Sequence, residues 1–268
     1  DPNAVLEEIY TAEELAGMDN EAQLEALNEI WRNFCVSDTF EPGSTAKPLT
    51  IAAALEEGAV KEDDTFFCDG YEMVAGWRIR CHVFPDSHGD LSLSGALEES
   101  CNDCLMQIVN KLGAPDFAKY QRLFGLNRKT GIDLPGEAAG ILYEESQLNA
   151  AELATGSFGQ GFTVTMLEMA SAISSVINGG NYYQPHLVKQ MLDAEGAVVS
   201  NTETVPVSRV VSEETSQYIR EAMYQVVNQG TGGVGKIEGY KIGGKTGTAE
   251  KIPRGNGKYV ISFISFAP

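Results

Sequence analysis

The stretch that decides the fold is Glu41-Pro42-Gly43-Ser44-Thr45-Ala46-Lys47-Pro48, which continues into the apolar segment 49–55. Gly43 can supply an unusual backbone conformation directly before Ser44, and the residues after it favour a helix. We therefore expect Ser44 at a helix start, with Lys47 on the same face. A hydroxyl there feels the positive end of the helix dipole and has an amine within reach, as a nucleophile requires. The alternative is a helix-capping serine beside a solvated lysine.

The composition is that of an ordinary globular protein. The chain has 268 residues, of which 43% are hydrophobic and 21% charged, and its formal net charge is -19. Such a negative charge argues against nucleic acid or an anionic membrane surface as a partner. The first residues lack the basic flank and apolar core of a signal peptide. If the protein works outside the cytoplasm, we expect the targeting segment to lie outside this sequence.

The five cysteines are not typical of a disulfide framework, because their number is odd and their spacing irregular. A single disulfide is still compatible with the sequence. Cys68, Cys81, His82 and His88 fall within a short span and raise the question of zinc. None of them matches a paired Cys-x-x-Cys or His-x-x-x-His spacing. The spacing therefore predicts no metal site.

Helical patterns fill the middle of the chain, and the β segments 240–250 and 259–266 close it, which predicts an α+β fold. The glycine-rich segment 230–236 fits most of a phosphate-binding loop. However, Ile237 stands where the magnesium-binding hydroxyl belongs, and the glycines follow a helix instead of a strand. We expect that segment to be a linker into the closing hairpin.

Two short motifs could complete a site around Ser44. Ser100-Cys101-Asn102 offers an uncharged hydroxyl and amide for proton relay and for holding a substrate amide, although turns and caps use the same residues. The segment 243–248, Gly-Gly-Lys-Thr-Gly-Thr, places three glycines in a strand, as close approach of another backbone would require. Basic residues outnumber acidic ones from 236 to 258, which indicates a cradle for an anionic ligand or a lysine-protected edge strand.

In this order, Ser-x-x-Lys, Ser-x-Asn and Lys-Thr-Gly form a signature of penicillin-binding proteins and class A β-lactamases. The segments 32–33, 36–44, 130–137, 157–161 and 244–249 resemble the transpeptidase domain of class B penicillin-binding proteins, of the sporulation or division type. The resemblance covers nearly the whole chain. It implies one domain over residues 1–268, a β-lactamase/transpeptidase-like fold in which helices flank an antiparallel sheet.

The resemblance also implies subdivisions of that fold. We expect a mainly helical subdomain at roughly 60–180 and a final β-hairpin at 237–267. Compared with the family, the chain begins after the first strands and stops before a last strand and closing helix. The expected sheet is therefore incomplete, with exposed edges.

The function implied by the resemblance is that of a peptidoglycan D,D-transpeptidase, a target of β-lactam antibiotics. Ser44 would attack the D-Ala-D-Ala carbonyl of a stem peptide, and Lys47 would accept its proton. Ser100 would relay a proton to the leaving amine, and Asn102 would orient Lys47 and the substrate amide. Backbone N–H groups of Ser44 and Thr248 would form the oxyanion hole. The substrate carboxylate would be held by residues of the third motif: Lys245, Thr246 and Thr248, with Gly247 beside them.

The same resemblance implies partners and a location. Stem peptides and β-lactams would bind, without a cofactor and without nucleic acid. The parent protein would be anchored in the bacterial membrane through an N-terminal segment absent here, would act on its extracytoplasmic face and would join a cell-wall synthesis complex. Two other functions stay open: a serine β-lactamase, which needs a glutamate for deacylation that we cannot assign, and a β-lactam sensor or inactive binding module.

The cysteines add one more prediction. Cys101 lies inside the second motif, and Cys81-His82 precedes Gly89 as in sporulation-type members of the family. This resemblance implies that Cys81 and Cys101 can form a disulfide that distorts the Ser100 loop, as a redox switch. The alternative is two buried, inert thiols.

Overall fold

The structure is a computed structural model that describes residues 2–267, so Asp1 and Pro268, the two ends of the sequence, lie outside the described residues. Its helices are α1 (Pro2–Ile9), α2 (Ala12–Gly17), α3 (Asn20–Trp31), α4 (Phe34–Ser37), α5 (Lys47–Glu56), α6 (Leu93–Glu98), α7 (Asn102–Leu112), α8 (Ala114–Leu123), α9 (Ala150–Gly156), α10 (Met166–Ile177) and α11 (Glu213–Asn228). The short 3-10 helices are η1 (Gly43–Ala46), η2 (Glu145–Gln147) and η3 (Gly233–Gly235).

The strands are β1 (Thr39–Phe40), β2 (Thr65–Cys68), β3 (Tyr71–Val74), β4 (Trp77–Arg80), β5 (Gly89–Ser92), β6 (Val164–Thr165), β7 (Asn181–Tyr183), β8 (Gln190–Leu192), β9 (Val198–Asn201), β10 (Pro206–Arg209), β11 (Gly243–Glu250) and β12 (Tyr259–Phe266). Within residues 2–267 every sheet has two strands. β11 and β12 pair antiparallel without a break, from Gly243 opposite Phe266 to Glu250 opposite Tyr259. The predicted α+β class and the incomplete sheet are confirmed, whereas the subdomain boundaries stay a prediction.

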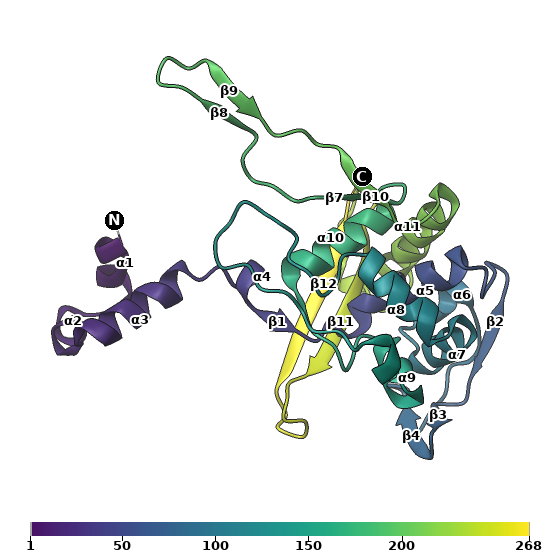
Figure 1. Ribbon diagram of the computed structural model, residues 1–268. Helices are drawn as coiled ribbons and strands as arrows, with labels where there is room; N and C mark the ends of the chain where they lie inside the picture. The colour runs from purple at the N-terminus through teal and green to yellow at the C-terminus, as the bar shows by residue number, and fades with distance from the viewer. Residues whose placement is uncertain (1, 268) are drawn as a thin grey trace.

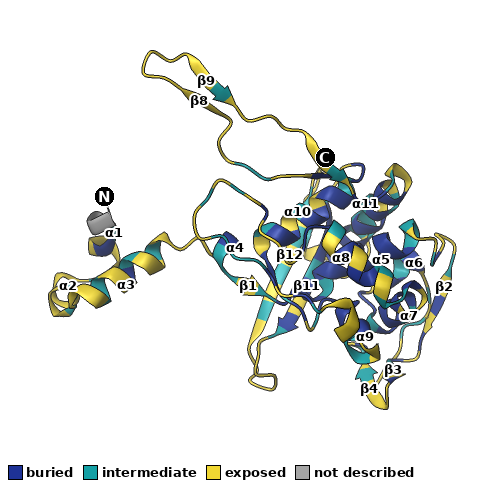
Figure 2. Cartoon of the chain, viewed as in Figure 1, coloured by how far each residue is buried: buried dark blue, intermediate teal, exposed yellow. Residues whose placement is uncertain are grey.

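Helix α5 is the centre of the body (Figure 1) and contacts α7, α8, α10 and α11, while α11 also contacts β11. Almost all of α5 is buried, and its three consecutive alanines, Ala52 to Ala54, let the neighbouring helices approach closely. Figure 2 shows buried residues concentrated in this body. The helices α1 to α3 and the β8–β9 hairpin project away from it, and their residues are mostly exposed. The site therefore belongs to the packed body.

The start of α5 differs from the sequence-based expectation. The helix begins at Lys47, and Ser44 lies inside the preceding 3-10 helix η1, whose N-cap residue is Pro42. Neither η1 nor α5 has a side-chain cap hydrogen bond, so the interpretation of Ser44 as a capping serine is wrong. In residues 2–267 no helix has both the length and the apolar character needed to cross a membrane.

Candidate active site

The serine of the opening motif is held where η1 meets strand β11. Gly43 has a φ of +56°, and a Cβ built there would lie 2.8 Å from the carbonyl oxygen of Thr248. Gly247, on strand β11, makes the matching close contact, since a Cβ built there would lie 2.9 Å from the carbonyl oxygen of Pro42. The prediction that glycines in 243–248 permit a close backbone approach is confirmed, and the approaching backbone is the chain's own Ser44 turn.

The second motif is carried by a tight turn between α6 and α7. Ser100 has a φ of +53°, a left-handed conformation that is uncommon for a residue other than glycine. The turn is fixed by backbone bonds, because Ser100 N donates to Leu97 O at 3.1 Å and Cys101 N to Ala96 O at 2.9 Å. Cys101 is the N-cap of α7, and its Sγ accepts a hydrogen bond from Cys104 N at 3.4 Å. Backbone strain of this kind is commonly stored at functional sites.

Two lysines converge on the Ser100 hydroxyl. Lys47 Nζ lies 3.1 Å and Lys245 Nζ 2.9 Å from Ser100 Oγ. Lys47 also donates to Asn102 Oδ1 at 2.7 Å and to the carbonyl oxygen of Ser100. The structure thus brings together Lys47, Ser100, Asn102 and Lys245 from three distant segments, as the sequence motifs predicted.

Both amines are fully buried, with 0% exposure, and this burial controls their protonation. Loss of solvation, and then the nearby charge of Lys245, holds the pKa of Lys47 well below its usual range. Burial also lowers the pKa of Lys245, to about 8. Lys47 is therefore the group adapted to act as a base, whereas Lys245 can still carry a charge in neutral solution.

The half-buried Ser44 opens onto a cleft of about 290 Å³. The residues that line it are Ser44, His82, Ser100, Asn102, Phe158, Gln160, Thr231, Thr246, Gly247 and Thr248. Four of these (His82, Phe158, Gln160 and Thr231) were given no role from the sequence. Phe158 and Gln160 lie in the glycine-punctuated segment 157–161, whose resemblance to the family could have indicated a place at the cleft. Thr231, in contrast, lies in the segment expected to be a linker.

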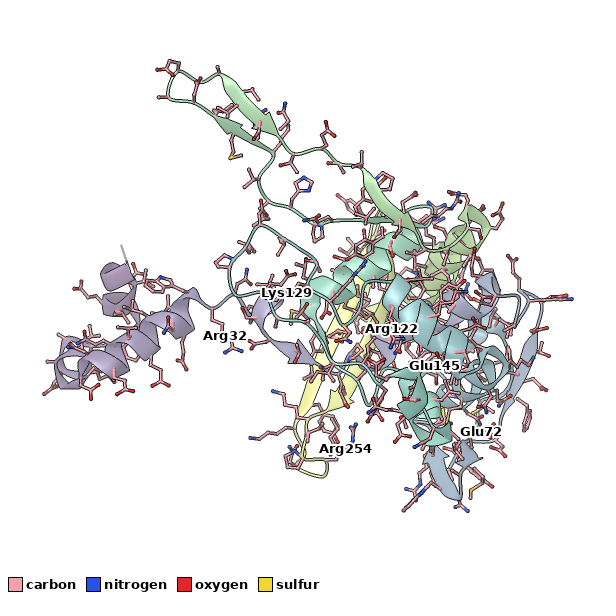
Figure 3. The ribbon with its side chains drawn as sticks, in the orientation of Figure 1. Arg32, Glu72, Arg122, Lys129, Glu145 and Arg254 are labelled. Atoms are coloured by element: carbon pink, nitrogen blue, oxygen red, sulfur yellow. The ribbon has the colours of Figure 1, made fainter. Side chains whose placement is uncertain are left out.

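The buried carboxylate of Glu41 links two of the segments that surround the cleft. Glu41 accepts a hydrogen bond from Gly161 N at 2.9 Å, and Arg254 Nη2 lies 3.0 Å from both of its oxygens. Figure 3 labels Arg254 at the turn between β11 and β12. Gly43 N also donates to Gly159 O at 2.9 Å. The Ser44 turn, the 157–161 loop and the hairpin therefore form one connected frame.

The predicted Cys81–Cys101 disulfide is not formed in this structure, where all five cysteines are free thiols. The two sulfur atoms are 3.7 Å apart, which is contact without a covalent bond. The bridge therefore stays a prediction.

A serine at the cleft, two buried lysines that meet at a second serine, and a neighbouring antiparallel strand are the arrangement typical of serine acyl-transfer sites of the penicillin-recognising class. The sequence profile of one family, described as "Penicillin binding protein transpeptidase domain", matches residues 4–268. The chain belongs to this family.

Two relatives show how the similarity is distributed. Stage V sporulation protein D of Bacillus subtilis is 41% identical over 242 residues, which are 88% of this chain and 37% of that protein. Peptidoglycan D,D-transpeptidase FtsI of Escherichia coli is 31% identical over 273 residues, 98% of this chain and 43% of that protein. The chain thus spans less than half the length of these two relatives.

Solved structures of penicillin-binding proteins have the same fold as this chain. The D,D-transpeptidase domain of a peptidoglycan glycosyltransferase from Eggerthella lenta has a TM-score of 0.82 and 27% identity, covering 92% of this chain and 64% of that one. Penicillin binding protein 3 of Mycobacterium tuberculosis, complexed with aztreonam, has a TM-score of 0.79 and 30% identity, covering 88% of this chain and 55% of that one. The predicted β-lactamase/transpeptidase-like fold is confirmed.

Proposed function

We propose that this chain is the catalytic part of a peptidoglycan D,D-transpeptidase that acts through an acyl-enzyme on Ser44. The observation that carries this proposal is the convergence of the two buried amines, Lys47 and Lys245, on Ser100 Oγ beside the cleft that Ser44 lines. A relative whose name is peptidoglycan D,D-transpeptidase FtsI supports it.

Acylation begins with a proton transfer to Lys47. A neutral lysine has two N–H donors, which match Asn102 Oδ1 and the carbonyl oxygen of Ser100, so its lone pair is free for a hydroxyl proton. Ser44 Oγ then bonds to the carbonyl carbon of D-Ala-D-Ala. As the C–N bond breaks, the proton passes through Ser100 to the amine of the departing D-alanine. An ester between the stem peptide and Ser44 remains.

Strand β11 positions the substrate. The charged Lys245 and the hydroxyls of Thr246 and Thr248 hold the terminal carboxylate, and Gly247 lets the strand lie close to the turn that carries Ser44. The N–H groups of Ser44 and Thr248 stabilise the developing oxyanion, where one donor is typically worth about 3 kcal/mol. An amine of a second stem peptide then attacks the ester, forms the cross-link and restores the Ser44 hydroxyl. β-Lactams acylate the same serine.

The competing functions differ in the fate of the acyl-enzyme. A serine β-lactamase needs a carboxylate placed to activate water for deacylation, and among the described residues none of those lining the cleft is aspartate or glutamate. This favours transfer to an amine over hydrolysis. A β-lactam sensor would stop at the acyl-enzyme.

The setting of the reaction belongs to the same proposal. Stem peptides are extracytoplasmic, so we infer that the parent protein acts on the outer face of the bacterial cell membrane. We also infer that it is anchored there through a segment outside this chain and works in a cell-wall synthesis complex. No step of the reaction needs a cofactor or nucleic acid.

A donor–acceptor assay tests the proposal. The chain is incubated with a stem-peptide mimic ending in D-Ala-D-Ala and with a D-amino acid as acceptor, and both free D-alanine and the exchanged product are measured. We expect exchange that Ser44→Ala abolishes and that Ser200→Ala, a change in the remote strand β9, leaves intact. Release of D-alanine with water as the only acceptor would contradict the proposal, and so would a folded protein without turnover.

A further inference from the structure

A second buried cluster lies on the other side of the turn that carries Ser100 and Asn102. The sulfur atoms of Cys68, Cys81 and Cys101 and a ring nitrogen of His88 all lie within 4.8 Å of one another. Cys68 and Cys101 are completely buried, Cys81 is nearly so, and His88 is half-buried. Acyl transfer uses none of these four side chains, so their assembly needs another explanation.

The distances within the cluster fit a tetrahedral metal centre. Cys81 Sγ lies 3.7 Å from Cys101 Sγ, while His88 Nδ1 lies 3.4 Å from Cys68 Sγ and 3.8 Å from Cys81 Sγ. With a zinc ion bonded tetrahedrally to sulfur at about 2.3 Å and to nitrogen at about 2.0 Å, neighbouring sulfurs are about 3.8 Å apart and sulfur–nitrogen pairs about 3.5 Å apart. These three edges need only small adjustments, and the other three are no longer than 4.8 Å.

The four ligands come from segments that the backbone already fixes. Cys68 ends strand β2 and pairs with Gly89 of β5, which places His88 next to it. Cys81 follows β4, and its N–H donates to Gly70 O at 2.8 Å. Cys101 is the N-cap of α7. Because each ligand lies on a segment held by backbone hydrogen bonds or a helix cap, the cluster is positioned by the fold and not by a chance approach of flexible loops.

The geometry points to a structural zinc site in which Cys68, Cys81, Cys101 and His88 Nδ1 bind one Zn²⁺. As the ion enters, the thiols lose their protons to solvent and the imidazole stays neutral, so three thiolates and the dication leave one net negative charge. No electron is transferred. All four coordination positions are filled by the protein, as in structural and not catalytic zinc sites. The sequence raises zinc for Cys68, Cys81 and His88, but the spacing rule rejects it because none of them stands in a Cys-x-x-Cys or His-x-x-x-His pair.

One of the sulfur atoms is also oriented by a neighbouring backbone group. Cys104 N already donates to Cys101 Sγ at 3.4 Å, the kind of outer hydrogen bond that orients a metal ligand.

The ion would brace the active site from behind. Cys101 stands between Ser100 and Asn102, the two residues that contact Lys47. Fixing Cys101 Sγ fixes the strained backbone on which both side chains depend. Zinc would therefore act as a positioning element, without touching substrate.

Metal analysis of the whole chain tests the inference. The protein is produced with zinc in the medium, purified under reducing conditions and assayed by plasma mass spectrometry, with folding checked by circular dichroism. We expect one zinc per chain in the wild type and in Cys35→Ser, whose thiol lies outside the cluster, and loss of zinc in Cys81→Ser and His88→Asn. Cobalt in place of zinc is expected to give a sulfur-to-metal charge-transfer band and the strong visible bands of tetrahedral coordination.

Three results would overturn the inference. One is folded, reduced wild-type protein that takes up neither stoichiometric zinc nor cobalt; another is zinc retained equally by Cys81→Ser and Cys35→Ser. The third is a Cys81–Cys101 disulfide that persists when the protein is produced with zinc. If the cysteine variants do not fold, the zinc content and cobalt spectrum of the wild type decide the question alone.

Discussion

The Ser100–Asn102 turn separates two buried clusters of different chemical character, one of amines and one of thiols with an imidazole. On one side, the amines of Lys47 and Lys245 meet at Ser100 Oγ and face a cleft of about 290 Å³. On the other, the sulfur atoms of Cys68, Cys81 and Cys101 and a ring nitrogen of His88 lie within 4.8 Å of one another. Burial has a different consequence on each side. On the first, it lowers the pKa of the Lys47 amine, so that the amine can be neutral and free to accept a proton; on the second, it surrounds thiol and imidazole side chains that we propose as zinc ligands.

The largest effect is expected from removing the base on the cleft side. Lys47→Met keeps the length of the side chain but removes the amine, so we expect acylation by a fluorescent penicillin to slow by about 10²–10⁴-fold, the usual contribution of a general base. Lys61→Met, a change of an exposed lysine, is the matched control and is expected to label normally. Equal labelling rates in the two variants would rule out Lys47 as the base.

The second prediction concerns the close contact between η1, which carries Ser44, and strand β11. Gly43 and Gly58 both have positive φ values, but only at Gly43 would a Cβ collide with β11, and Gly58 faces open space. Gly58→Ala is expected to cost about 1–2 kcal/mol in unfolding free energy and to leave acylation unchanged. Gly43→Ala is expected to slow acylation by about 10²-fold as well, because it displaces the oxyanion site.

Stopped-flow labelling and urea unfolding measure both glycine variants. If Gly43→Ala reacts as fast as Gly58→Ala, the close contact between η1 and β11 has no role in the reaction.

The pH profile separates the two lysines. In the proposed mechanism Lys47 acts in its neutral form, and its lowered pKa keeps it competent near neutrality. Lys245 acts in its charged form and has a pKa of about 8. For a substrate with a carboxylate, kcat/KM is therefore expected to fall about tenfold per pH unit above pH 8 as Lys245 loses its proton. Lys245→Arg stays charged and is expected to lose this basic limb. If kcat/KM of the arginine variant falls above pH 8 as it does in the wild type, the fall is caused by a group other than Lys245.

The smallest effect is expected at the frame behind the cleft. Arg254 is partly exposed and pairs with the buried Glu41, which keeps its hydrogen bond from Gly161 N when the arginine is removed. Arg254→Ala is therefore expected to lower the unfolding free energy by no more than about 1 kcal/mol. Thermal unfolding measures it, and a loss of several kcal/mol would show that the ion pair carries the frame.

The cleft side could be predicted from the sequence because its information is local. Ser44 with Lys47, Ser100 with Asn102 and the 243–248 strand are short motifs, and each places its side chains through one turn or one strand. The helix start was misplaced, because a 3-10 turn and the first turn of an α-helix use the same residues. Ser44 therefore lies before α5 and not at its cap.

The thiol side could be predicted only in part. The sequence indicates that Cys81 and Cys101 lie close together, but the full cluster depends on pairing between distant segments. Only the register of β2 with β5 brings His88 to Cys68, and only the α6–α7 turn brings Cys101 to Cys81. Neither contact leaves a spacing signature. The same reason applies to Thr231, whose hydroxyl is held by Glu98 O at 3.0 Å and which lines the cleft from a glycine-rich connection.

Mapping the site of penicillin attachment tests the central claim most directly. The folded chain is treated with a penicillin, digested and examined by mass spectrometry. The account predicts one adduct per chain, on Ser44 in the peptide that also carries Lys47, and none in Ser44→Ala. An adduct on another residue, or folded wild-type protein that forms none, would contradict it.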